Sequence, residues 1–253
     1  MNNFTYSVPT KIHFGKGQIS HLYELSESGN KVLLCYGGGS IKKAGIYDEA
    51  VKILKEEDIE IFELSGIAPN PKIESVREGV KLCKENDIDM VLAIGGGSVI
   101  DCAKVVAAGA CYDGDPWDLV ITPRWIKKAL PIYSVLTLSA TGSEMDPFAV
   151  ISDMSKNEKW GTSSEHMKPK MSILDPEYTY SVSKKQTAAG TADMISHICE
   201  NYFTNVKNAD VQARFAEGLL KNCFKYGPIA LEEPDNYDAR ANLMWTASMA
   251  ING

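Results

Sequence analysis

The chain has 253 residues, enough for one large or two modest domains, and its hydrophobic content of 44% can fill a sizeable core. Its 26 basic and 33 acidic side chains give a net charge of −7, which argues against nucleic acid or a membrane surface as the main partner. No apolar run approaches the roughly 18 residues that a membrane span needs, and no export signal is evident. The six cysteines form no CxxC pair, so we expect reduced thiols in a cytoplasmic protein.

Apolar periodicity predicts strands that alternate with helices up to about residue 175, which is typical of an α/β fold. The expected strands are at residues 10–15, 31–36, 59–64, 90–94 and 132–138, and the expected helices are at 18–26, 47–57, 73–86 and 98–107. We expect an irregular crossing at 112–131, and a hairpin in which 149–151 pairs with 171–174 around a charged loop. His13 and His21 have no evident partner nearby, which favours a structural role for both.

The pattern changes at Asp175-Pro176, after which only helical periodicity remains. Helices are expected at 184–203, 209–225 and 235–251. We therefore predict two domains, an α/β domain at 1–178 and an all-helical domain at 179–253.

Two segments combine an apolar strand, a glycine turn and a helix start: KVLLCYGGGSIKK from Lys31 and DMVLAIGGGSVIDCAK from Asp89. Glycine has no Cβ, so an anion can approach the free N–H groups of such a turn, and Ser98 is expected to cap the second helix. A plain strand-to-helix turn explains one such loop equally well, but two loops on one sheet favour a dinucleotide. Neither loop fits GxGxxG, because Lys42 and Ile100 occupy the last glycine position.

Two further segments carry polar groups that chemistry could use. SATGSEMD, which follows the strand at 132–138, is a loop that could approach a ribose or nicotinamide, or could simply connect two elements. Asp193 and His197 lie four residues apart, hence on one helical face, with Ser196 and Glu200 beside them. Such a pair can chelate a divalent cation, although from spacing alone an aspartate and a histidine so placed are more often a solvated pair, and His166 upstream is a poor third ligand.

The combined motifs resemble the iron-containing (group III) alcohol dehydrogenases, and within that family most closely the NADP-dependent butanol dehydrogenases. The matching segments are FGKG from Phe14, YGGGSIKK from Tyr36, PNP from Pro69, AIGGGSVIDCAK from Ala93, TLSATGSEMD from Thr137, LDPEYTY from Leu174, AAGTADMISH from Ala188 and NYDARANLMWTASMAING at the end. They span the chain from end to end.

The resemblance implies a Rossmann-like dinucleotide-binding domain followed by an all-helical metal-binding domain of the dehydroquinate synthase type. The implied cofactor-binding residues are Gly37, Gly38, Ser40, Asn70, Gly95, Gly96, Gly97, Ser98, Asp101, Thr137, Leu138 and Lys159. Asp193 and His197 match the first two metal ligands and would act in catalysis through Fe²⁺ or Zn²⁺. Many family members have asparagine where this chain has Asp146, which puts an amide contact to the nicotinamide at this position in doubt.

The implied activity is the NADPH-dependent, metal-assisted reduction of an aldehyde to a primary alcohol, of the butanal and butanol type, and the reverse oxidation by a homodimer. The sequence ends at Gly253 without the family's third and fourth metal ligands, so we expect a chain that lacks the C-terminal third. Two alternatives stay open at this point: an inactive nucleotide-binding fragment, or a polyol dehydrogenase of the glycerol type.

Overall fold

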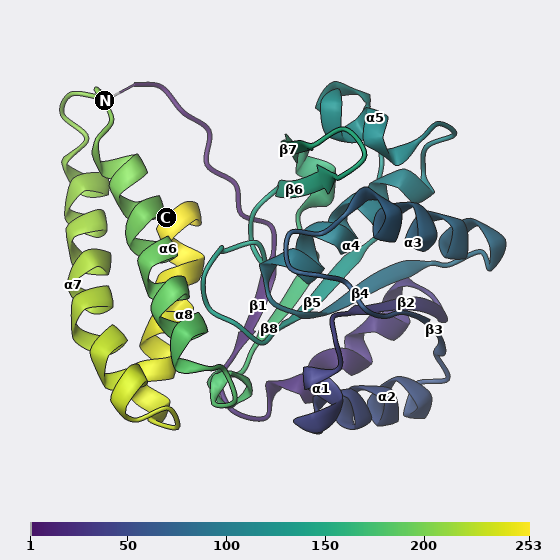
Figure 1. Ribbon diagram of the computed structural model, residues 1–253, viewed down its shortest axis with the longest axis horizontal. Helices are drawn as coiled ribbons and strands as arrows, with labels where there is room; N and C mark the ends of the chain where they lie inside the picture. The colour runs from purple at the N-terminus through teal and green to yellow at the C-terminus, as the bar shows by residue number, and fades with distance from the viewer. Residues whose placement is uncertain (1) are drawn as a thin grey trace.

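The computed structural model describes residues 2–253, with an α/β half and a helical half side by side (Figure 1). A six-stranded sheet with the order β1-β8-β5-β4-β2-β3 forms the centre of the α/β half. Its strands are β1 (Lys11–Phe14), β2 (Lys31–Tyr36), β3 (Glu60–Leu64), β4 (Met90–Gly95), β5 (Ile132–Leu136) and β8 (Met171–Leu174). All pairings in this sheet are parallel. Helices join the first five of its strands along the chain, and an antiparallel hairpin lies in the connection from β5 to β8.

Helices cover both faces of the sheet. They are η1 (Gln18–Ser28), α1 (Ser40–Lys43), α2 (Ile46–Glu56), α3 (Ile73–Glu85), α4 (Gly97–Ala110) and α5 (Pro116–Ile121). On β2, Val32 and Leu34 pack into the apolar cluster that contains residues of η1 and α2, whereas Leu33 and Cys35 pack with residues of α3 and α4. Burial on both faces explains why the central strands read as continuous apolar runs rather than as alternating ones.

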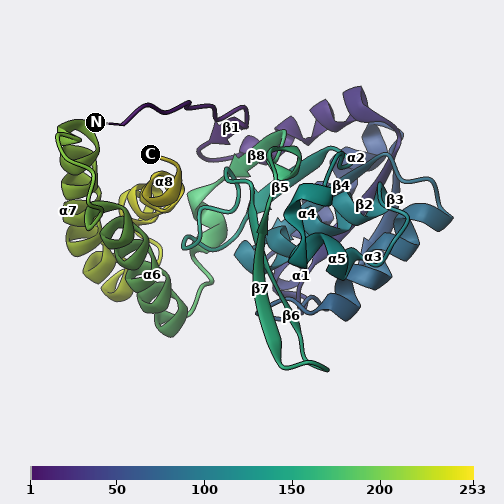
Figure 2. The same cartoon turned by 90° about the horizontal axis from the view of Figure 1, so that it is seen from above.

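The expected pairing of residues 149–151 with 171–174 is wrong. β6 (Phe148–Asp153) pairs instead with β7 (Glu158–Ser163) in an antiparallel hairpin that extends away from the main sheet (Figure 2). Asn157 adopts a left-handed backbone with φ 54°, which allows a tight turn between these strands. β8 is buried throughout and lies between β1 and β5, so its apolar side chains belong to the main sheet.

The crossing at 112–131 is more regular than expected. It contains α5, whose first turn is capped by the Asp115 side chain accepting a hydrogen bond from the Trp117 amide, and the short helix η2 (Pro123–Trp125). The helix expected at 18–26 is present as η1, a 3₁₀ helix rather than an α-helix.

Beyond β8 the described chain contains no further strand. The short helix η3 (Glu165–Met167) precedes β8, and η4 (Pro176–Thr179) follows it. Three long helices come next: α6 (Lys184–Tyr202), α7 (Asp210–Glu232) and α8 (Tyr237–Asn252). Side chains of Ser183 and Asn236 cap α6 and α8. The three helices share a separate apolar core, so the predicted fold class, an α/β half followed by an all-helical half, is confirmed. Of the helices in residues 2–253, none is long and apolar enough to cross a membrane.

Candidate functional site

The two glycine turns follow β2 and β4, which are neighbours in the sheet. A Cβ added to Gly37 would lie 3.2 Å from the Ile67 carbonyl oxygen and 3.9 Å from a Val99 methyl group, so the first turn packs beside the start of α4. A Cβ at Gly38 or Gly39 would meet nothing within 4 Å. This part of the first turn therefore borders open space at the carboxyl end of the sheet, where ligands of open α/β sheets bind.

The second turn leads into α4 through Gly96, which is the N-cap residue. No side chain caps this helix, so the expected capping role of Ser98 is wrong. The hydroxyl of Ser98 instead accepts a hydrogen bond from the Asn70 amide at 3.3 Å. Without a side-chain cap, N–H groups of the first turn of α4 remain available to an anion.

The glycines of this second turn also allow close packing. A Cβ at Gly97 would collide with the Thr141 side chain, and a Cβ at Gly95 would lie 2.6 Å from a side chain of α4. A Cβ at Gly96 would lie 3.2 Å from Cβ of Leu138, a contact that a small movement can relieve. Gly95 and Gly97 are thus required by the protein's own packing, whereas Gly96 is the position at which a side chain can be tested.

Three expected cofactor-binding residues from separate segments lie together. Asn70 lies in the loop before α3, and its backbone N–H donates a hydrogen bond to the Ser98 hydroxyl. Its side-chain oxygen accepts a hydrogen bond from Nζ of Lys159 at 2.8 Å. Lys159 comes from β7, so the hairpin brings a positive charge to the start of α4. Asn70 has a left-handed backbone with φ 54°, which turns the loop at this point. The arrangement provides an ammonium group next to an uncapped helix N-terminus.

The loop that follows β5 connects the second glycine turn to the helical half. The Thr137 amide extends the hydrogen bonding between β4 and β5 with an N···O distance of 3.0 Å, and Leu138 packs against Gly96. A Cβ on Gly190 of α6 would lie only 2.5 Å from the Ser139 carbonyl oxygen. The loop at 137–141 therefore contacts both the turn that precedes α4 and the helix that carries Asp193 and His197.

Asp101 has its carboxylate engaged by the hairpin and the loop before it rather than by residues of the glycine turn. It accepts hydrogen bonds from the Ser143 hydroxyl at 2.7 Å and from the Val150 amide at 2.9 Å. Burial raises the pKa of Asp101 from 3.8 to about 6, although nearby Lys104 opposes this shift. In this structure Asp101 fastens α4 to β6.

Asp101→Asn is expected to remove a pH dependence of stability. Because the native pKa of Asp101 lies above its unfolded value, its contribution to stability is fully present below pH 3.8 and is lost as the pH rises through about 6. The unfolding free energy of the parent relative to the variant should therefore fall between pH 4 and pH 7, by on the order of 2–3 kcal/mol. Urea unfolding of both proteins across this range measures the difference, and parallel curves would contradict it.

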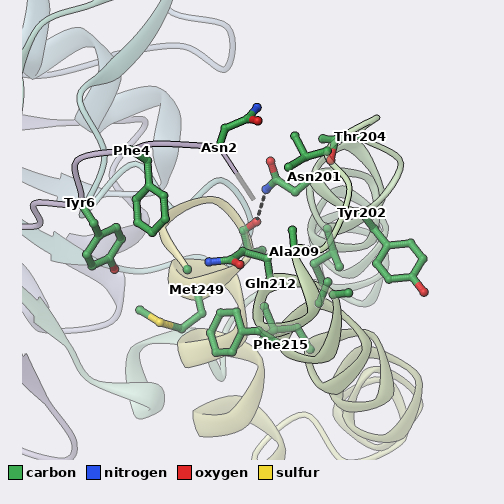
Figure 3. A pocket seen from close by; sticks show the side chains of 17 residues that line it. Asn2, Phe4, Tyr6, Asn201, Tyr202, Thr204, Ala209, Gln212, Phe215 and Met249 are labelled. Carbon is green, nitrogen blue, oxygen red and sulfur yellow. Dashed lines mark hydrogen bonds between the residues drawn. The ribbon is translucent and has the colours of Figure 1, made fainter.

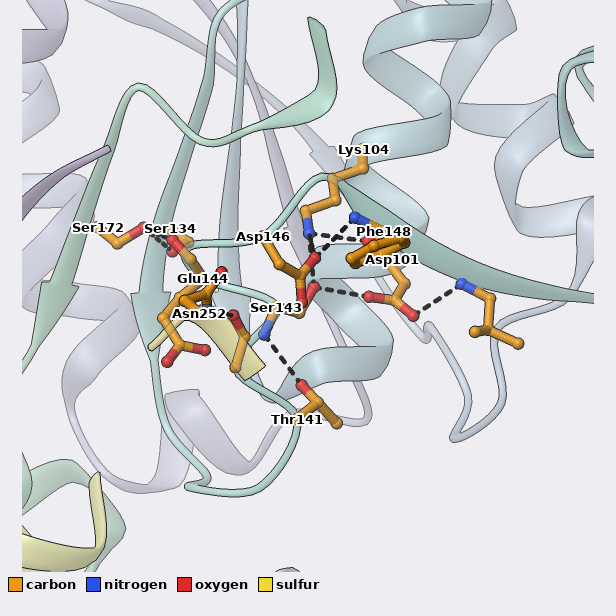
Figure 4. A network of polar contacts seen from close by, with 12 residues as sticks. Asp101, Lys104, Ser134, Thr141, Ser143, Glu144, Asp146, Phe148, Ser172 and Asn252 are labelled. Carbon is orange, nitrogen blue, oxygen red and sulfur yellow. Dashed lines mark hydrogen bonds and ion pairs between the residues drawn. The ribbon is translucent and has the colours of Figure 1, made fainter. Parts of the chain in front are cut away.

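Lys104 is the polar residue that the sequence reasoning missed. It is fully buried, and its Nζ donates to the Ser143 hydroxyl at 2.9 Å, to the Asp146 carboxylate at 2.8 Å and to the Phe148 carbonyl at 2.8 Å (Figure 4). Asp146 is committed to this ion pair, with a pKa that burial raises and Lys104 lowers. The available signal was a lysine within an apolar stretch of the helix, flanked by Ala103 and Val105.

Asp193 and His197 share one side of α6. His197 Nε2 lies 3.8 Å from the Asp193 carboxylate, and side-chain exposures of 23% and 43% leave both accessible. Nδ1 of His197 is buried and has no hydrogen-bond partner among residues 2–253. Ser196 and Glu200 are exposed beside the pair.

A separate hollow lies in the helical half. A pocket of about 630 Å³ lies between the N-terminal segment and α6 to α8, with Phe4, Tyr6, Asn201, Phe215 and Met249 among its lining residues (Figure 3). None of the lining residues has a charged side chain. Since neither the glycine turns nor the Asp193–His197 pair lines it, this apolar pocket is separate from the candidate site.

Comparison with known proteins identifies similar sequences and structures. Residues 9–176 match the sequence profile of the iron-containing alcohol dehydrogenases. The chain is 59% identical over 254 residues to NADH-dependent butanol dehydrogenase A of Clostridium acetobutylicum, covering 100% of this chain and 65% of that protein. It is 46% identical over 256 residues to the NADPH-dependent aldehyde reductase YqhD of Escherichia coli, covering 100% of this chain and 66% of that protein.

Solved structures show the same arrangement of elements. The crystal structure of NADH-dependent butanol dehydrogenase A from Thermotoga maritima superposes with a TM-score of 0.97 at 48% identity, covering 100% of this chain and 64% of that chain. The present chain thus spans about 65% of the length of the Clostridium relative. A profile match over most of the chain and this close structural likeness lead to one assignment: the chain belongs to the iron-containing alcohol dehydrogenase family.

Proposed function

We propose that the protein catalyses the NADPH-dependent, metal-assisted reduction of aldehydes to primary alcohols, of the butanal and butanol type, and the reverse oxidation. The observation that carries the proposal is the loop at 137–141, which contacts both the turn before α4 and the helix of Asp193 and His197. A nucleotide at the first and a metal at the second would then lie on either side of one short loop. Family membership, and the alcohol and aldehyde enzymes among the relatives, support this reading.

The α/β half has groups that suit a dinucleotide. Open space beside Gly38 and Gly39 leaves room for a ligand at the first turn. The uncapped N-terminus of α4 offers N–H groups and a positive dipole to a pyrophosphate, and Lys159, held by Asn70, adds a full positive charge. These residues would bind and orient the dinucleotide, while Thr137 and Leu138 would border its path toward α6.

The helical half offers part of a metal site. A carboxylate oxygen of Asp193 and Nε2 of His197 lie close enough to share one divalent cation, and Fe²⁺ and Zn²⁺ both suit such a donor pair. When bound, the metal would supply a Lewis acid for the aldehyde oxygen, and NADPH would supply the hydride. The chain's own residues would place these groups, because Gly190 lets α6 approach the Ser139 carbonyl closely.

The preference for NADPH rests on the first glycine turn. The relatives differ, since the Clostridium enzyme is named for NADH and the Escherichia coli enzyme for NADPH. This chain has Gly39 where an acidic side chain would repel a 2′-phosphate, with exposed Ser40 and Lys43 beside it. Lys42 is less available, because its ammonium lies 3.6 Å from the Glu63 carboxylate.

Gly39→Asp is expected to weaken NADPH binding much more than NADH binding, because the new carboxylate would face the 2′-phosphate. Gly39→Asn is the matched control: it has the same shape and must adopt the same left-handed backbone, with φ 97°, but carries no charge. Titration of each variant with both cofactors by calorimetry measures the four affinities. Equal losses for NADPH and NADH in Gly39→Asp would contradict a 2′-phosphate contact at this turn.

The catalytic proposal is tested on the intact protein as its host produces it, with butanal and NADPH. Asp193→Asn and His197→Ala should each lower kcat by at least about a hundredfold, some 2.7 kcal/mol, and leave the Kd for NADPH unchanged. His166→Ala, in exposed η3, is the control and should have no effect. The oxidation rates of glycerol and of butanol, measured separately, distinguish the proposed activity from a polyol dehydrogenase of the glycerol type. Full turnover in both α6 variants would refute the role of the pair.

We also propose that the chain divides into domains at 1–178 and 179–253, because the sheet and the three long helices have separate apolar cores. Limited proteolysis between Asp175 and Ser183 would test this division. The homodimer implied by the resemblance stays a prediction, and light scattering of the intact protein tests it. A cytoplasmic location is consistent with six unpaired cysteines.

A further inference from the structure

Three metal-binding side chains meet at the edge of the sheet, away from the glycine turns and α6. His13 comes from the edge strand β1, and His21 and Glu24 come from η1. In a 3₁₀ helix, residues three apart are eclipsed, so His21 and Glu24 project from the same side of η1. The expectation that both histidines lack a partner is therefore wrong: the fold brings them to each other and to Glu24.

The donor atoms converge on one point. One carboxylate oxygen of Glu24, Oε1, lies 2.9 Å from Nε2 of His13 and 3.1 Å from Nδ1 of His21. The two imidazole rings are stacked, with centroids 3.6 Å apart and planes inclined by 11°. The three residues can offer ligand atoms that all lie within 4.8 Å of one another.

The contacts within this group leave one nitrogen unsatisfied. Nε2 of His13 is buried and forms no hydrogen bond to any described residue, because its short approach to Glu24 lacks the required direction. The other oxygen of Glu24 accepts a hydrogen bond from Nζ of Lys11 at 2.7 Å, which orients the carboxylate. A buried imidazole nitrogen that lies beside a carboxylate oxygen without a hydrogen bond between them is the kind of atom that a metal ion would satisfy.

We propose that His13, His21 and Glu24 form a second metal site that binds Zn²⁺ or a similar divalent transition metal. Two histidines and one carboxylate form a donor set that suits Zn²⁺, with the fourth position left to water. The side chain of His21 is 30% exposed and gives solvent access, whereas those of His13 and Glu24 are 13% and 12% exposed. Such a metal would clamp η1 to the edge strand.

The site is tested with Zn²⁺ alone, by competition with a chromophoric chelator, in an Asp193→Ala/His197→Ala background that removes the donor pair on α6. One equivalent of Zn²⁺ should still bind and should raise the unfolding temperature. Glu24→Gln and His21→Gln, which keep similar size, should each weaken this binding at least about tenfold, as loss of a ligand predicts. Glu27→Gln, which changes an exposed carboxylate on the same helix, should leave the affinity unchanged.

Circular dichroism of each variant establishes that it is folded before titration, and Co²⁺ provides a second readout. Co²⁺ bound to the Asp193→Ala/His197→Ala protein should show the visible absorption of a nitrogen- and oxygen-ligated ion. This absorption should disappear when His21→Gln is added. Zn²⁺ affinity and Co²⁺ absorption that are unchanged in folded Glu24→Gln and His21→Gln would overturn the proposal. Failure of this test would leave the aldehyde reductase proposal untouched, because that proposal depends on Asp193 and His197.

Discussion

Gly96→Val is expected to reduce dinucleotide affinity by at least about a hundredfold, which corresponds to about 2.7 kcal/mol. Backbone strain is not the cause, because Gly96 has φ −88°, a value open to every residue. The cause is steric: an isopropyl group at the N-cap of α4 would occupy the approach to the free N–H groups. The contact of the new Cβ with Leu138, at 3.2 Å, requires only a small adjustment, so the variant should fold.

Calorimetric titration of the variant with NADPH measures this loss, and Gly96→Ala should give an intermediate affinity. Gly218→Ala on α7 is the control glycine replacement, since a Cβ there meets nothing within 4 Å and the site is remote from the turn. A folded Gly96→Val protein that binds NADPH with the parent's affinity would mean that the turn only connects β4 to α4.

Lys104→Met is expected to destabilise the protein by about 3–5 kcal/mol, the usual cost of removing one partner from a buried ion pair. Nζ of Lys104 makes three hydrogen bonds in an environment without solvent, and the change leaves Asp146 buried without its cation. Ser143 and the Phe148 carbonyl also lose a donor, which adds to the cost. The unfolding free energy in urea gives the difference directly.

The matched variants separate charge from packing. Asp146→Asn keeps an oxygen that can accept from the Phe148 amide, so it should cost less than Lys104→Met. The double variant Lys104→Met/Asp146→Asn removes both members of the ion pair and should recover part of the loss, giving a coupling energy between the two sites. A cost below about 1 kcal/mol for Lys104→Met would contradict a structural role for the buried ammonium group.

The elements with a strong local signal were predictable. Apolar runs such as Val32–Cys35 and Val91–Ile94 could only be buried strands, and the helical periodicity after Ser183 matched α6, α7 and α8. The pairing of β6 was not predictable in the same way. A short strand does not encode its partner, and the choice between β7 and β8 was decided by the tight turn at Asn157 and by burial.

Long-range polar contacts limit how much of the candidate site could be predicted from the sequence. Asn70, Ser98 and Lys159 were assigned by motif resemblance, and no periodicity relates positions so far apart, yet hydrogen bonds join them. The partners of Asp101 and Lys104 lie on the hairpin and the loop before it, some forty positions along the chain or more, so their orientation depends on tertiary packing. Sequence reasoning identifies residue types suited to a task more readily than the direction in which each side chain points.

The position of β1 in the sheet has a consequence for biosynthesis. Among the described strands β1 pairs with β8 alone, so β1 has no strand to pair with until Met171–Leu174 has been synthesised. A ribosome synthesises the intervening chain over many seconds, and between the synthesis of β5 and that of β8 the sheet has an open edge at β5 where β8 will later pair. Sheet completion is therefore a late event with a long closing loop, and a chaperone that shields the β5 edge of the nascent chain should raise the yield of folded protein.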